Sequence, residues 1–347
     1  MLTLKQVKAI REHLEKAQNP LFLFDNDIDG ICSFLLLQRY IGRGKGFPVK
    51  SFPSLNESYF KKIEELKSDY VFILDKPVVS KEFFDLAEKF NIPVVWIDHH
   101  ETKIKEIPAF VNYYNPLYNK SKKNEPVTAL CYQITKQKKD LWLAIAGCVA
   151  DKFLPKYYKE FLEKNPDLAI KSKDPFEILY RSEIGRIGRL FGFGLKDKTT
   201  NVINMIKFLM NVKGPYDVLE ENAQTRILHK RFNELNSKYR KILEKAVDLE
   251  DSNEKVLFFK YGGDLSISAD ISNELSFMYT NKVIVVVYVN GSMANISIRG
   301  KKIRPKLLKA IEGLVGASGG GHEDAVGARI SVQDIDLFKK RFITLVK

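Results

Sequence analysis

Short, continuous apolar runs alternate with helix-period segments over residues 20–150. The apolar runs are rich in β-branched and aromatic residues, as strands buried on both faces of a parallel sheet are; they are Leu21–Phe24, Val71–Leu74 and Val94–Ile97. Apolar residues recur at helical spacing in the intervening and following segments, which are Cys32–Tyr40, Tyr59–Lys67, Lys81–Phe90, Val127–Gln137 and Leu141–Ala150. This strand–helix–strand alternation predicts an α/β domain built on a parallel sheet.

The rest of the chain follows a different pattern. Residues 152–250 contain no strand-like run, and 218–250 is a long, polar, helix-forming stretch of the kind that bridges domains. Strand candidates return at VLFFKY, KVIVVVYV, MANISIRG and ARISV, with helices expected at Ile267–Met278, Ile303–Leu314 and Asp334–Val346 and a glycine-rich turn before ARISV. We therefore predict an N-terminal parallel-sheet domain over 1–190, a helical connector over 191–253 and a smaller C-terminal α/β domain over 254–347.

Composition agrees with a soluble globular protein of more than one domain. The chain has 347 residues, of which 45% are hydrophobic and 29% charged. No apolar run reaches membrane-spanning length, and the amphipathic N-terminus lacks a secretory signal. The three cysteines, Cys32, Cys131 and Cys148, have no metal or redox spacing and lie in apolar stretches. We expect them to be buried thiols in the reducing cytoplasm, with no membrane association.

The chain is strongly basic. Lysine and arginine number 56 against 43 aspartates and glutamates, a formal net charge of +13. A surplus of this size favours a polyanionic partner, with nucleic acid the first candidate. Basic proteins also stay soluble because of their charge, so charge alone leaves the two explanations about equal.

Acids and histidines follow each of the three predicted N-terminal strands. The first strand leads into Asp25-Asn26-Asp27-Ile28-Asp29-Gly30, the second ends at Asp75, and the third ends at Asp98-His99-His100. Because ligands of open α/β sheets bind beyond the carboxyl ends of the strands, these groups should meet in one crevice. A further acid, Asp151, closes the apolar helix 141–150 and is placed to join them.

Each acid alone has a simpler explanation. Asp25 or Asp151 by itself is more often a turn or helix-cap residue, and the string DNDIDG resembles a calcium loop only faintly, since its terminal glutamate is missing. Clustered carboxylates, however, repel one another unless cations neutralise them. The combination therefore predicts a metal site, and its oxygen-rich character suits Mn²⁺ or Mg²⁺.

These motifs resemble the DHH phosphoesterase superfamily. Asp98-His99-His100 is similar to its signature, Asp27-x-Asp29-Gly30 to its first motif, Asp75 to its second and Asp151 to its later acidic motif. Near the C-terminus, Gly319-Gly320-Gly321-His322 and Ser297-x-Arg299 resemble the DHH-associated C-terminal domain. The DNDIDG form is similar to RecJ-type single-strand exonucleases and their archaeal relatives, although this chain is shorter than bacterial RecJ.

The resemblance implies a two-metal site in the cleft between the N- and C-terminal domains. Asp75 would bridge two Mn²⁺ or Mg²⁺ ions, Asp98 would hold the ring of a ligand histidine, and His100 would touch the scissile phosphate or the leaving oxygen. The remaining metal ligands would be Asp27, Asp29, His99 and Asp151. The substrate would contact His100, Ser297, Arg299, Gly319, Gly320, Gly321 and His322. Asp25 would orient a metal-bound water or cap the turn.

Three departures from the family pattern stand out. Leu23 occupies the position where the family's pyrophosphatases carry a histidine, which argues against a pyrophosphatase. Lys76 and Pro77 follow Asp75 where small residues are usual, so this loop is expected to be specialised. Glu323 and Asp324 follow the glycine-rich motif, and two acids would weaken a phosphate pocket unless they face away from it.

The sequence thus predicts a metal-dependent exonuclease that releases nucleoside 5′-monophosphates from single-stranded DNA or RNA. A helicase or a replisome protein is the kind of protein partner expected. One alternative is a phosphodiesterase or phosphatase for short oligonucleotides, cyclic dinucleotides or phosphoadenosine phosphate. Another is a non-catalytic subunit of a replication complex, against which the intact ligand set speaks. Strand polarity, DNA or RNA preference and oligomeric state have no sequence signal.

Overall fold

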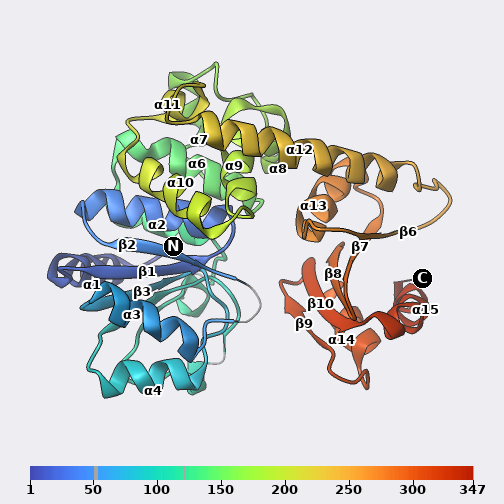
Figure 1. Ribbon diagram of the computed structural model, residues 1–347, viewed down its shortest axis with the longest axis horizontal. Coiled ribbons are helices and arrows are strands. Elements are labelled where there is room, and N and C mark those ends of the chain that lie inside the picture. Colours follow the sequence, from blue (N-terminus) through green and yellow to red (C-terminus); the bar gives the residue numbers. More distant parts are fainter. Residues whose placement is uncertain (51–53, 103, 121, 347) are drawn as a thin grey trace. The chain divides into compact units, whose positions relative to one another are not determined.

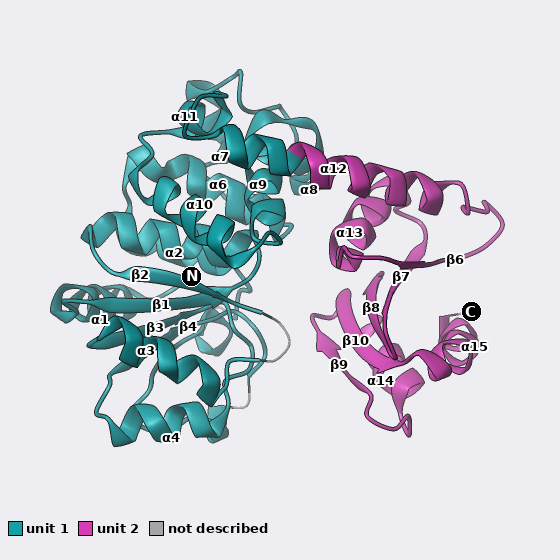
Figure 2. Ribbon diagram, in the orientation of Figure 1, with its two compact units in different colours: residues 1–232 teal, residues 233–347 magenta. Residues whose placement is uncertain are grey.

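The computed structural model describes residues 1–50, 54–102, 104–120 and 122–346. The chain divides into two compact units, Met1–Phe232 and Asn233–Lys347 (Figure 2). The division falls inside α12 (Arg226–Val247), which lies within the long polar stretch expected to be helical. The three-part division with a connector over 191–253 stays a prediction. Among the described residues, no helix combines the length and apolarity needed to cross a membrane.

The first unit is built on a five-stranded parallel sheet in the order β2-β1-β3-β4-β5 (Figure 1). Its strands are β1 (Pro20–Asp25), β2 (Lys45–Val49), β3 (Tyr70–Leu74), β4 (Val94–Ile97) and β5 (Asn112–Tyr114). The three apolar runs are confirmed as the central strands. Sequence analysis missed the two edge strands, because β2 contains Gly46 and Pro48 and β5 is only three residues long.

Helices cover both faces of this sheet. They are α1 (Leu4–Lys16), α2 (Ile28–Ile41), α3 (Phe60–Leu66), α4 (Lys81–Lys89), α5 (Val127–Thr135) and α6 (Leu141–Ala150). On one face, Leu21 and Ile73 belong to a core with Phe60 of α3 and Phe83 of α4. The alternate strand residues point to the other face, where Phe22 and Phe24 pack on Phe34 of α2. Burial on both faces explains why the central strands are continuously apolar.

A helical layer follows α6 within the same unit. It comprises α7 (Tyr158–Lys164), α8 (Pro175–Arg181), α9 (Glu183–Gly194), α10 (Thr199–Asn211) and α11 (Pro215–Leu219). Arg39 of α2 connects this layer to the sheet domain. Its Nη2 lies 2.7 Å from Asp140 Oδ1, and its Nη1 donates a hydrogen bond at 2.7 Å to the carbonyl of Val212, just past α10. Five short 3₁₀ turns complete the described chain, at Glu57–Tyr59, Ile104–Glu106, Pro116–Tyr118, Lys138–Asp140 and Val332–Asp334.

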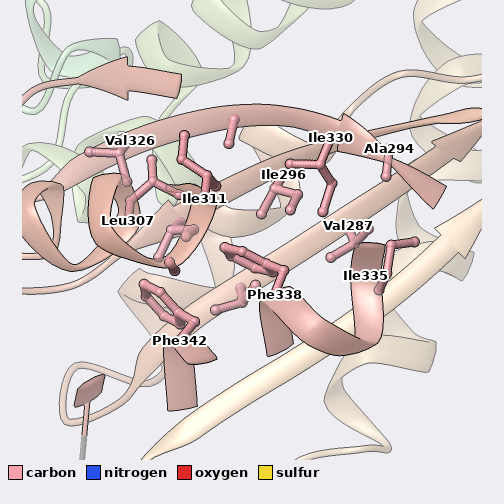
Figure 3. Packing of buried hydrophobic residues seen from close by; sticks show 14 of the residues in the cluster. Val287, Ala294, Ile296, Leu307, Ile311, Val326, Ile330, Ile335, Phe338 and Phe342 are labelled. Carbon is pink, nitrogen blue, oxygen red and sulfur yellow. The ribbon is translucent and has the colours of Figure 1, made fainter. Parts of the chain in front are cut away.

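The second unit has a mixed sheet in the order β6-β7-β8-β10-β9, in which only the β6–β7 pair is parallel. Its elements are β6 (Val256–Gly262), α13 (Ser268–Met278), β7 (Val283–Asn290), β8 (Met293–Arg299), α14 (Arg304–Ile311), β9 (Ser318–Gly321), β10 (Ala325–Ser331) and α15 (Ile335–Val346). Figure 3 shows the core between the sheet and α14 and α15, where Phe338 and Phe342 lie beside Leu307 and Ile296.

The glycine-rich segment differs from the expected turn. Residues 318–321 form the edge strand β9, which pairs with β10. The actual turn begins at Gly321, whose φ of +125° is a conformation that side-chain-bearing residues rarely adopt. A glycine run has low strand propensity, so tertiary pairing with β10 overrides the local preference here.

Candidate active site

The strand order of the first sheet reverses between β1 and β3, and ligands of such sheets bind at the carboxyl ends flanking that reversal. Asp27 lies just past β1 as the N-cap of α2, where its Oδ1 accepts a hydrogen bond from the Gly30 N–H at 2.8 Å. Gly30 allows this tight turn, because a Cβ there would lie 2.2 Å from the Asp25 carbonyl oxygen. The turn therefore holds Asp25, Asp27 and Asp29 together at the strand end.

Asp29 lies in the first turn of α2 and is buried. Its two carboxylate oxygens accept hydrogen bonds from the backbone N–H groups of Val127 and Thr128, at 2.9 and 2.7 Å. These groups are the first of α5, so a carboxylate is favourable there. Asp29 thus fixes α5 against α2, and the lone pairs left on its oxygens remain available for a cation.

Asp75 has the most unusual environment of the acids. It follows β3 with φ of +60°, in the left-handed region that aspartate tolerates better than most residues, and is 2% exposed. Its Oδ1 is buried and makes no hydrogen bond, although His99 Nε2 lies 3.2 Å away. Burial, and then the negative charges of Asp29 and Asp27, raise the pKa of Asp75 well above its ordinary value. A buried carboxylate oxygen without a hydrogen bond, among other acids and beside an imidazole, fits a cation ligand.

His99 lies between two of these acids. Its Nε2 faces Asp75, and its Nδ1 lies 3.8 Å from Asp151 Oδ2. Burial alone would lower the pKa of His99, but the charges of Asp151 and Asp75 outweigh it and raise this pKa well above the usual value. The Asn124 Oδ1 lies 2.9 Å from His99 Nδ1 and can accept a hydrogen bond from its N–H, which makes Nε2 the nitrogen suited to coordination. Sequence analysis missed Asn124, which lies in an unpatterned loop before α5.

Asp98 contacts His100. Its Oδ1 accepts a hydrogen bond from His100 Nδ1 at 2.8 Å. The expectation that Asp98 holds the ring of a metal-ligating histidine stays a prediction. Thr102 Oγ1 donates to the other oxygen of Asp98 at 3.2 Å. Burial opposes ionisation of Asp98, but this hydrogen bond and the nearby imidazoles together lower its pKa. The two adjacent histidines therefore have different hydrogen-bond partners, although both lie within 4 Å of Asp75 Oδ1, His99 Nε2 at 3.2 Å and His100 Nδ1 at 3.8 Å.

Within the first unit, the donors assemble into three groups in each of which the ligand atoms lie within 4.8 Å of one another. They are Asp25–Asp27–Asp75, Asp29–His99–Asp151 and Asp75–Asp98–His100. Oxygen donors dominate, and two of the groups share Asp75. This donor set fits divalent cations such as Mn²⁺ or Mg²⁺.

Asp25 and Lys76 form a buried ion pair at the edge of these groups. The Lys76 Nζ lies 2.8 Å from Asp25 Oδ1, and the side chains of Lys76 and Asp25 are 3% and 19% exposed. The specialised loop after Asp75 thus supplies a cation of its own. Asp25 Oδ1 also accepts the backbone N–H of Asn26 at 2.9 Å. The role of Asp25, whether it orients a metal-bound water or caps the turn, stays a prediction.

Within the second unit, α13 supports the strand that carries the predicted substrate residues. Arg299 Nε donates to Asn273 Oδ1 at 2.5 Å, and Ser297 Oγ lies 2.9 Å from Ser268 Oγ. Ser297 is buried, so its side chain fits a supporting role for β8 better than direct contact with a substrate. Sequence analysis missed Asn273 and Ser268, because both lie on an ordinary helical pattern.

The two acids after the glycine-rich motif bind the loop that precedes α14. Asp324 Oδ1 accepts the backbone N–H of Lys302 at 2.7 Å, and the Glu323 carbonyl accepts that of Ile303 at 3.0 Å. The Asp324 carboxylate therefore binds the backbone of the basic loop, and this contact gives Asp324 a structural role beside the glycine-rich motif. His322 follows Gly321 in the turn, and its N–H donates to the Ala325 carbonyl at 2.9 Å.

Comparison with known proteins agrees with this interpretation. Residues 21–151 match the N-terminal domain of the DHH family, and residues 253–347 match the DHHA1 domain. The chain is a member of the DHH superfamily. No curated protein sequence matches it significantly.

Solved structures share the fold of this DHH protein at low sequence identity. RecJ from Thermus thermophilus in complex with Mn²⁺ has a TM-score of 0.68 and 15% identity over 98% of this chain and 54% of its own. The DHH domain of a member of the s1p family of ribosomal proteins has a TM-score of 0.70 and 16% identity, over 99% and 90%. An exonuclease RecJ bound to manganese has a TM-score of 0.63 and 15% identity, over 99% of this chain and 94% of its own. The DHH chain thus has a RecJ-like fold and spans about half the length of the Thermus protein.

Proposed function

We propose that this protein is a metal-dependent phosphodiesterase that removes nucleoside 5′-monophosphates from an end of single-stranded nucleic acid. The observation that carries the proposal is the buried Asp75 Oδ1 at the strand reversal, which makes no hydrogen bond, has His99 Nε2 at 3.2 Å and belongs to a donor group with Asp27. The RecJ-like fold and the net positive charge support the choice of substrate class. Two bound divalent cations would supply a water of lowered pKa and neutralise the charge of the phosphate.

The residues of the first unit then have distinct tasks. Asp75 would bridge both cations, while Asp27, Asp29, His99 and Asp151 complete their ligand sets. Asp98 holds the Nδ1–H of His100, so the opposite ring nitrogen is the one that would face a substrate. From there His100 would donate to the scissile phosphate or give a proton to the leaving oxygen.

The residues of the second unit would hold the strand. Arg299 is steadied by Asn273, and a planar guanidinium suits a phosphate. The glycines 319–321 let backbone N–H groups approach the same anion, with His322 beside them. We propose that both units act on one substrate, with the basic residues after β8 following its backbone.

Digestion of end-labelled single strands tests this function. DNA and RNA labelled at the 5′ or 3′ end are incubated with Mn²⁺ beside matched duplexes. We expect mononucleotides from one end only and resistance of the duplex. Turnover confined to dinucleotides would favour the short-substrate alternative, and no turnover with bound Mn²⁺ would favour a non-catalytic subunit.

Binding of a long single strand should weaken steeply as salt rises. Lys301, Lys302 and Lys309 are exposed on the loop after β8 and on α14, and each phosphate contact releases condensed counterions, with a log–log slope of roughly −0.7 per contact. Fluorescence anisotropy of a labelled strand with Ca²⁺ in place of Mn²⁺ measures this slope. The Lys301→Ala/Lys302→Ala variant should reduce its magnitude. A flat dependence in the parent would assign the charge to solubility alone.

A further inference from the structure

The Asp25–Lys76 ion pair lies within one of the donor groups of the proposed metal site. Asp25 belongs to the group with Asp27 and Asp75, whereas the second group consists of Asp29, His99 and Asp151. Lys76 Nζ contacts the Asp25 carboxylate directly. In the second group, the ring of His99 is held by Asn124, a neutral side chain. The lysine therefore places a positive charge beside the first group.

The backbone around Lys76 is fixed by long-range contacts. The left-handed conformation of Asp75 turns the chain at the end of β3, and Trp96 Nε1 of β4 donates to the Lys76 carbonyl at 2.9 Å. The side chain then extends past the end of β1, where Nζ also lies 3.4 Å from the Lys50 carbonyl after β2. Lys76 thus lies across the ends of neighbouring strands with its side chain only 3% exposed.

A cation fixed at this point has two consequences. It neutralises one carboxylate of a crowded acidic cluster, which lowers repulsion in the metal-free protein. It also occupies an oxygen of Asp25 and repels any divalent ion approaching Asp27 and Asp75 from that side, in surroundings where burial limits screening.

We propose that Lys76 is a charge-setting and positioning residue that makes the two metal positions unequal. The ion in the group of Asp29, His99 and Asp151 binds tightly. The ion in the group of Asp27 and Asp75 binds more weakly, with Asp25 withheld as a ligand. The inference rests on the proposed two-metal function and adds to it a specific order of metal loading.

Metal titration of charge variants tests this inference without any measurement of activity. Protein stripped with EDTA and dialysed is titrated with Mn²⁺, with free Mn²⁺ followed by electron paramagnetic resonance and heat by calorimetry. Lys76→Met keeps the alkyl chain and removes the charge. We expect this variant to raise the affinity for the more weakly bound ion at least roughly tenfold, because one nearby buried positive charge is lost. The affinity for the more tightly bound ion should change much less. Lys81→Met, on exposed α4, serves as the matched control and should leave both affinities unchanged.

A charge-neutral double variant covers the case in which Lys76→Met does not fold without metal. Asp25→Asn/Lys76→Met replaces the ion pair by uncharged groups of similar size. It should fold and bind the weaker ion nearly as the parent does, because the net charge of the site is unchanged. A loss of that ion's affinity by roughly tenfold or more, the scale of a removed carboxylate ligand, would make Asp25 a ligand and overturn the inference.

The titrations separate failure of this inference from failure of the proposed function. A parent protein that takes up no Mn²⁺ contradicts the proposed function, and this inference with it. A parent that binds two ions, with a folded Lys76→Met variant whose weaker affinity is unchanged or reduced, contradicts the role of Lys76 alone.

Discussion

Replacing Asp75 by Asn should reduce hydrolysis of single strands by at least roughly 10³-fold under saturating Mn²⁺, the scale on which loss of a preorganised charge-stabilising group lowers turnover. Asp75 is the acid that two of the donor groups share, and its Oδ1 is buried without a hydrogen bond. Asparagine is the right substitution because it tolerates the φ of +60° at this position. The change therefore removes charge without straining the turn.

The same variant should be more stable than the parent when both are free of metal at neutral pH. Burial raises the pKa of Asp75 in the folded state, so the folded protein binds this proton more tightly than the unfolded chain. Metal-free stability therefore falls as pH rises above the unfolded value of about 4, toward the raised folded pKa. The asparagine in the variant does not ionise and has no such penalty. Thermal melts of both proteins in EDTA at about pH 5 and about pH 7.5 measure the difference, which should be larger at the higher pH.

Addition of Mn²⁺ should reverse this order, because only the parent gains the full binding free energy. Asp85→Asn, on the exposed face of α4, is the matched control and should change neither hydrolysis nor the response to metal. Near-normal turnover by Asp75→Asn, with the fold intact, would refute the bridging role and with it the two-metal site.

The parts of the fold that depend on local pattern were predictable. The central strands β1, β3 and β4 are buried on both faces and therefore consist of unbroken apolar residues. Parallel strands also place their carboxyl ends at one edge, which is why Asp27, Asp75 and His99, distant in sequence, were expected to meet. The structure brings them together, with Asp151 reaching His99 from the end of α6.

The partners of these residues were not predictable, because they depend on side-chain direction and on long-range packing. Nothing in the sequence indicates that Lys76 reaches back across β1 to Asp25, since this requires the left-handed turn at Asp75 and the hydrogen bond from Trp96. The hydrogen bond between Asp98 and His100 likewise depends on the direction of each histidine ring after β4. The strand β9 exists only because β10 pairs with it.

Replacing Arg299 by Ala should lower the specificity constant for a long single strand roughly ten- to hundredfold while both metals still bind. A charge-assisted contact between arginine and phosphate contributes about 1.5–3 kcal/mol, and each 1.4 kcal/mol is a factor of about ten. Because Arg299 is proposed to hold a phosphate remote from the reacting one, a small generic phosphodiester should be hydrolysed almost as well by the variant as by the parent.

Two further variants make this test specific to Arg299. Asn273→Ala removes the side chain that receives the Arg299 Nε–H, so it should reproduce part of the loss on long strands and none on the small diester. Lys260→Ala, at an exposed position of the edge strand β6 of the same sheet, should leave hydrolysis of both the long strand and the small diester unchanged. An equal loss of Arg299→Ala activity on small and long substrates would make Arg299 part of the chemical step. Unchanged activity on both would remove it from the substrate site and leave Asn273 and Arg299 as a structural pair between α13 and β8.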